Sequence, residues 1–140
     1  MLMADALYVI MHWLHISSVV ALIGGLFYAS LTMIPASSAL AAEAREALSE
    51  KAAAAFRPVV VAAIAGLIVS GTYNILSSPG HTVRYHIALG IKLLLAAHVF
   101  AVALLATRAG PNPRRARMMA GAAISGFLII LISVYLRRIF

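Results

Sequence analysis

The sequence predicts an all-α integral membrane protein in which four transmembrane helices form an up-down bundle. Three observations predict this fold class. The chain is 64% hydrophobic and only 11% charged, whereas soluble domains are about 25% charged. The mean hydropathy is +1.01. The apolar residues lie in four long runs, and a backbone that crosses lipid must satisfy its polar groups internally, as a helix does.

The whole chain, 1–140, is expected to form a single membrane domain. The predicted spans cover approximately residues 4–34, 52–76, 83–107 and 118–136. About 20 residues suffice to cross the hydrocarbon core of a bilayer. Because the connections between these spans are mostly short, neighbouring spans should be antiparallel.

Helix-breaking residues set the expected span ends. Pro35 should end the first span, because proline lacks an N–H group and crowds the preceding turn. The alanine-rich, more polar segment 36–51 is expected to form an interfacial helical stretch that leads into span two. Arg57-Pro58 falls near the predicted start of that span, where a proline in a first turn is well tolerated. The segment from Ser77 to Gly80 is typical of a turn and should end span two.

Glycines within the spans predict close approaches between helices. Gly66 and Gly71 in span two are expected to let a neighbouring helix come near. The pair Gly24-Gly25 in span one has two interpretations. It could admit a flat macrocycle, or it could simply accommodate another helix.

The distribution of basic residues predicts the orientation. The net charge is +7, but the Lys and Arg residues cluster at span ends and form no nucleic-acid-binding ribbon. One side of the membrane holds seven of them and the other side three: Arg45, Lys51, Arg57, Arg108, Arg114, Arg115 and Arg117 against Arg84, Arg137 and Arg138. The positive-inside rule then places both termini outside, which is the periplasm if the bilayer is a bacterial inner membrane.

Polar side chains within a bilayer are costly, so each is a candidate functional residue. The chain has no cysteine, which excludes thiolate metal sites and cysteine-ligated clusters. The candidates within the spans are His12, His15, Arg57, His86, Lys92 and His98.

Helix geometry relates these candidates in depth and direction. At 1.5 Å per residue, His15 and Lys92 lie about 15 Å and about 14 Å below the outer end of their spans, and His98 about 22 Å. His12 and His15 are about 60° apart and share a face. His86, Lys92 and His98 are each about 120° apart, so they cannot all face one cavity.

Histidines on facing membrane helices are one way to hold haem b, since neutral imidazole is a good iron ligand. His15 and His98 are the preferred axial ligands, with His12 and His86 as alternates. Arg57, Arg84 and Lys92 could meet the propionates, and Lys92 is the candidate catalytic residue. The expected function is electron transfer or the oxidation of a small lipophilic substrate.

Two alternatives stay open. Thioether and imidazole groups near the outer face suit Cu(I) binding or transport; these are Met1, Met3, Met11, His12, His81 and His86. Alternatively, the histidines only hydrogen-bond between helices, and the chain is a small structural subunit of a larger membrane complex. Helices that carry glycines often self-associate, so a homodimer is also possible.

The stretch from Leu14-His15 through Gly24-Gly25-Leu26-Phe27-Tyr28 to Ile34-Pro35 resembles the first helix of CopD-like membrane proteins. The same stretch is similar to that of HemJ-type protoporphyrinogen oxidases, four-span proteins whose third span has a Lys-Leu step, matched here by Lys92-Leu93. The resemblance implies an essential or haem-ligating His15 and an essential Lys92. The Asn-Glu-x-Pro pattern of HemJ-type proteins before span four is absent here, so the resemblance points to the superfamily rather than to either branch.

Overall fold

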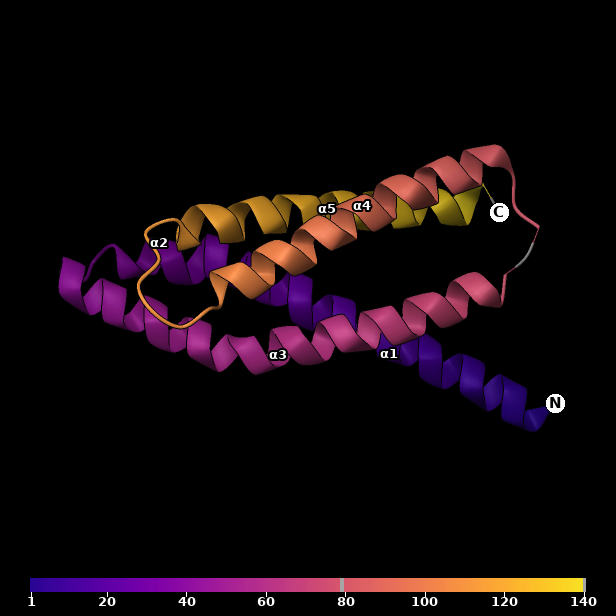
Figure 1. The fold of residues 1–140 in the computed structure, drawn as a ribbon, viewed down its shortest axis with the longest axis horizontal. Helices are drawn as coiled ribbons and strands as arrows, with labels where there is room; N and C mark the ends of the chain where they lie inside the picture. The colour runs from indigo at the N-terminus through magenta and orange to yellow at the C-terminus, as the bar shows by residue number, and fades with distance from the viewer. Residues whose placement is uncertain (79, 140) are drawn as a thin grey trace.

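A computed structural model describes residues 1–78 and 80–139 as a bundle of four long helices. All four are long and apolar enough to cross a membrane, and no strand occurs in this part of the chain. The two termini lie at the same end of the bundle, as four antiparallel spans require (Figure 1). The predicted all-α fold class is confirmed.

The first long helix continues past the residue that was expected to end it. It comprises α1 (Leu2–Tyr28), the π-helical turn η1 (Ala29–Met33) and the short α2 (Ile34–Ser37). Pro35 therefore lies within a helix, contrary to the expectation. A proline inside an α-helix crowds the carbonyl four residues earlier, and the wider π turn directly before α2 gives the backbone room to accommodate it.

The second long helix, α3 (Ala42–Leu76), begins ten residues before the predicted span. The polar segment after residue 41 is thus the first part of the same helix. Pro58 consequently lies inside α3 rather than in its first turn, which corrects the expectation from sequence. The carbonyl of Ala54 loses its usual N–H partner there.

The last two helices form the second half of the bundle. These are α4 (Val83–Ala106) and α5 (Arg115–Arg138). The hydroxyl of Thr82 accepts a hydrogen bond from the Tyr85 N–H at 3.3 Å, which satisfies one of the unpaired donors at the start of α4.

The four helices pack as two hairpins. α1 packs mainly along α3, and α4 packs mainly along α5, whereas the contacts of α1 with α5 and of α3 with α4 are fewer. The buried core lies chiefly in the half of the bundle that contains the end of α4 and the start of α5: Leu22, Leu26, Ala29, Val60, Ala63, Val99, Ala103, Ala106, Met119, Ala122, Ala123 and Ile129. In the half that holds the termini, the helices have few buried residues.

Two arginines satisfy the carbonyl groups where α4 ends. Arg57 of α3 donates to the Leu104 carbonyl at 2.9 Å. Arg115 of α5, only 3% exposed, donates to the carbonyls of Ala106 at 2.8 Å, Arg108 at 3.3 Å and Gly110 at 2.9 Å. These carbonyls have no intrahelical partner. Arg57 thereby joins the two hairpins at this end, and Arg115 joins them through a further bond to Ser49 of α3 at 2.8 Å.

Only some of the predicted close approaches at glycines occur. A side chain at Gly25 would overlap the Phe56 ring of α3, so this glycine allows α1 to approach α3. At Gly24 and Gly71, a Cβ atom would meet no neighbouring helix of the described chain within 4 Å. Gly24-Gly25 therefore accommodates a neighbouring helix on one side only.

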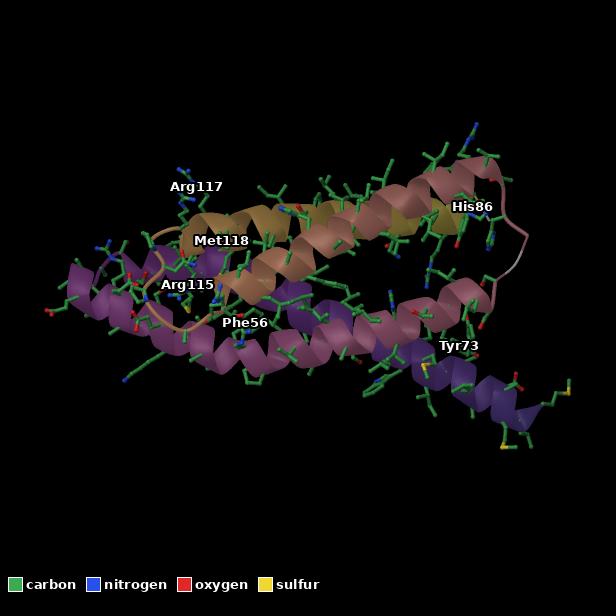
Figure 2. All side chains as sticks on the ribbon, in the orientation of Figure 1. Phe56, Tyr73, His86, Arg115, Arg117 and Met118 are labelled. Atoms are coloured by element: carbon green, nitrogen blue, oxygen red, sulfur yellow. The ribbon has the colours of Figure 1, made fainter. Side chains whose placement is uncertain are left out.

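Replacing Arg115 with Ala should destabilise the bundle, because it leaves several buried carbonyls without a donor. We expect the free energy of unfolding in detergent to fall by about 3 kcal/mol or more. Arg117→Ala is the matched control, since Arg117 is exposed and points away from the bundle (Figure 2), and it should change the value by about 0.5 kcal/mol at most. Equal effects of the two substitutions would contradict the capping role.

Candidate functional site

The side chain of His15 is held by a hydrogen-bond chain that runs from α1 into α3. His15 Nδ1 lies 2.9 Å from Ser70 Oγ, and Ser70 Oγ donates to the Gly66 carbonyl at 2.7 Å. Ser70 has one hydroxyl hydrogen, and the carbonyl of Gly66 uses it. When the hydroxyl hydrogen lies on the Gly66 carbonyl, His15 donates through Nδ1, which leaves the lone pair on Nε2.

Gly66 also sets how closely α1 and α3 approach at this point. A Cβ atom there would lie 3.2 Å from Leu14 Cδ1 and would overlap the Ser18 hydroxyl. Ser18 and Ser70 are both buried. The predicted close approach at Gly66 thus occurs, and it brings the His15 ring within hydrogen-bonding reach of Ser70.

Lys92 and His12 lie within electrostatic range of His15. Lys92 is partly buried on α4, so three helices contribute to this region. His12 Nε2 is 3.5 Å from Arg137 Nη2 of α5, and its ring stacks on Tyr8 at a centroid distance of 5.8 Å. We call His12, His15, Ser70 and Lys92 the His15 cluster.

His98 lies at a different helix interface, the one between α4 and α5. Its Nδ1 is 3.1 Å from Ser125 Oγ of α5, and the residue is largely exposed. Among the described residues, no second acceptor takes the Ser125 hydroxyl hydrogen, so the tautomer of His98 is not fixed as that of His15 is. His15 is therefore bonded to α3 and His98 to α5. Lys92 and His98 are about 120° apart around α4, so they face different neighbours.

The other predicted site residues lie outside the His15 cluster. Arg57 is bound to the end of α4, about 20 Å along α3 from Ser70 at 1.5 Å per residue. His86 is exposed near the start of α4, where its ring meets Tyr85 edge-on. Arg84 is also exposed. These residues are thus distributed along the bundle and do not converge on one point.

The His15 cluster can offer one fixed imidazole lone pair and one ammonium group to a ligand. Within the described part of the chain, no three His, Asp or Glu side chains gather as a metal-binding group. A ligand that brings its own coordination sphere needs only one or two protein donors.

Sequence reasoning missed Ser70 as a functional residue. Serines are common in membrane helices, and the partner of Ser70 lies 55 positions away in the chain. The spacing Gly66-x-x-x-Ser70, two small residues one helical turn apart, is the one local signal that marks this face as a helix contact.

Comparison with known proteins gave no matching family model, no similar curated protein and no similar solved structure. The resemblance of the first span to CopD-like and HemJ-type proteins therefore stays a prediction from sequence.

Replacing Gly66 with Leu should force α1 away from α3 and break the bond between His15 and Ser70. Overpacking of this kind costs about 1–3 kcal/mol, measured as a lower free energy of unfolding in detergent. Gly71→Leu, in the same helix with open space around it, is the control and should be nearly neutral. A stable Gly66→Leu protein would show that the helices do not meet at this glycine.

Proposed function

We propose that the chain is a haem b-binding integral membrane protein with His15 as the axial ligand. One observation carries this proposal: His15 Nδ1 lies 2.9 Å from Ser70 Oγ, an arrangement in which Nδ1 can donate to the hydroxyl oxygen and the Nε2 lone pair is available. Histidines that ligate metals almost always donate their other ring N–H to a neighbouring group, which fixes the ring and its tautomer. The donor chemistry of His15 therefore fits the requirement of haem iron.

Lys92 is the second residue of the proposed site. Its ammonium group lies near His15 on a different helix, and a charge at this depth is costly without a partner. A haem propionate or an anionic substrate group would supply that partner. Lys92 is accordingly the candidate catalytic residue, with the role of binding and orienting a carboxylate.

The sparse packing of the terminal half of the bundle supports a ligand in this region. Haem, when bound, supplies one-electron redox chemistry. The chain itself would hold the iron through His15, keep the carboxylate near Lys92 and exclude water with its apolar helices. Because His98 contacts Ser125 of α5 and lies outside the His15 cluster, the chain would hold the iron through His15 alone and leave room for a small lipophilic substrate.

We also propose the membrane and the orientation that the sequence predicts. The protein would lie in a bacterial inner membrane with both termini in the periplasm, because most basic residues lie at the opposite end. The His15 cluster would then be closer to the periplasmic face. A homodimer or a larger membrane complex would cover the sparsely packed half of the bundle.

Protein expressed with ample haem should show a Soret band after purification, and His15→Ala should abolish it. His98→Ala and His86→Ala are matched controls that should keep the band. A change from a low-spin to a high-spin spectrum in His98→Ala would assign His98 as a second axial ligand instead. A preparation that carries copper and no haem would contradict the proposal and favour the copper-handling alternative.

Replacing Ser70 with Ala should weaken haem binding without removing the ligand. Loss of such an outer-shell partner typically lowers affinity about 10- to 100-fold, which a titration of the haem-free protein would measure. Ser125→Ala, which removes the hydroxyl beside His98, is the control and should leave the affinity unchanged. Equal affinities of the Ser70→Ala and unaltered proteins would show that this bond does not prepare His15 for a metal.

A further inference from the structure

The bundle contains a cavity of about 850 Å³ at the end opposite the His15 cluster. It lies between η1, α2, the first half of α3 and the start of α5. Its volume falls within the range of about 300–1,000 Å³ that is usual for small-molecule sites. The proposed haem site does not use it, so the cavity needs its own explanation.

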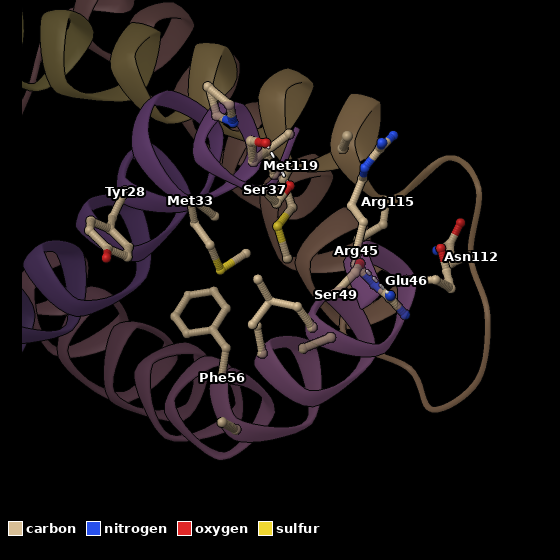
Figure 3. Close-up of a pocket in the computed structure, with 18 of the residues that line it drawn as sticks. Tyr28, Met33, Ser37, Arg45, Glu46, Ser49, Phe56, Asn112, Arg115 and Met119 are labelled. Carbon is tan, nitrogen blue, oxygen red and sulfur yellow. Dashed lines mark hydrogen bonds between the residues drawn. The ribbon is translucent and has the colours of Figure 1, made fainter. Parts of the chain in front are cut away.

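The lining of the cavity is divided into a polar and an apolar end. Figure 3 shows Arg45, Glu46, Ser49, Asn112 and Arg115 gathered on one side, and Tyr28, Met33 and Phe56 towards the other. The cavity is thus amphipathic. An amphiphile with a compact polar head and an apolar tail matches this division.

The polar end holds a buried positive charge that no carboxylate of the described residues neutralises. The hydrogen bonds of Arg115 go to three carbonyls and to the Ser49 hydroxyl, all of them neutral acceptors. Arg45, which lines the same end, donates to the Leu40 carbonyl at 3.3 Å, another neutral acceptor. Two guanidinium groups therefore favour an anion at this end, and phosphate is a preferred partner of arginine.

The same end also holds a carboxylate that lacks a donor. Glu46 Oε1 is buried, and no donor of the described residues lies within hydrogen-bonding distance of it. A buried polar atom left without a partner is costly. A ligand that fits both arginines and Glu46 combines an anion with a hydrogen-bond donor, and an N–H-bearing cation also complements the negative charge of Glu46.

The position of the cavity along the helices indicates where such a ligand comes from. α3 has 35 residues and is about 50 Å long, whereas the hydrocarbon core of a bilayer is about 30 Å thick. Because most charged residues of α3 lie in its first turns, this length favours a position of Arg45 and Glu46 at the level of the lipid headgroups. Phe56, three turns further along, lies at the level of the acyl chains.

We propose that this cavity binds a phospholipid whose headgroup carries a primary ammonium beside the phosphate, as in phosphatidylethanolamine. The phosphate would face Arg45 and Arg115, the ammonium would donate to Glu46, and an acyl chain would occupy the space beside Met33 and Phe56. The polar and apolar ends of the cavity match the orientation of a lipid within its own leaflet.

The test is a titration of delipidated protein in detergent with single-chain lipids, followed as a rise in melting temperature. Lysophosphatidylethanolamine should bind at least about tenfold more tightly than lysophosphatidylcholine, whose ammonium has no N–H, or lysophosphatidylglycerol, which has no cation. Glycerophosphoethanolamine, the head without a chain, should bind much more weakly. Equal or tighter binding of any of these three would overturn the proposal.

Two substitutions locate the site. Glu46→Gln should reduce the preference for lysophosphatidylethanolamine over lysophosphatidylcholine to within about twofold. Ala52→Phe should abolish binding because Ala52 lines the cavity, whereas Ala54→Phe on the exposed face of α3 should not. Binding that survives Ala52→Phe, or a preference that survives Glu46→Gln, would overturn the proposal. His15→Ala should bind this lipid normally, so a failure of the haem proposal is distinguishable from a failure here.

Discussion

The capping of the end of α4 by two guanidinium groups is the interaction on which the rest of the bundle depends. A membrane helix that ends at the level of the headgroups must still satisfy its last carbonyls. Arg57 reaches them from α3 and Arg115 from α5, so each hairpin is tied to the same point. The positive charges also complement the negative end of the α4 dipole.

This capped end gives the molecule two halves with different properties. Near Arg115 the helices share a continuous buried core, and the cavity beside it has a defined polar end. Towards the termini the helices have few buried residues, and the side chains of His15 and Lys92 are only partly buried. The two proposed ligands would therefore occupy differently packed regions at opposite ends of the bundle.

Hydropathy alone predicted the number of helices, their approximate extents and the all-α fold. The rise per residue also predicted that Lys92 lies level with His15, and the structure places Lys92 within electrostatic range of His15. Sequence did not predict the rotation of each helix, because these helices are apolar all round and lipid is as apolar as a helix interface. The partners of His15, His98 and Arg57, which lie 55, 27 and 47 positions away, depend on that rotation.

The π turn η1 (Ala29–Met33) has a consequence for chain length. A π turn accommodates one more residue than an α turn, so this segment is equivalent to a single-residue insertion in a regular helix. Deleting one residue here would restore α geometry and leave the later residues facing the same neighbours, whereas α geometry without a deletion would turn every later position of the helix by about 100°. Pro35 and the short α2 would then face a different neighbour, so the register of this helix is fixed by residue count as well as by residue type.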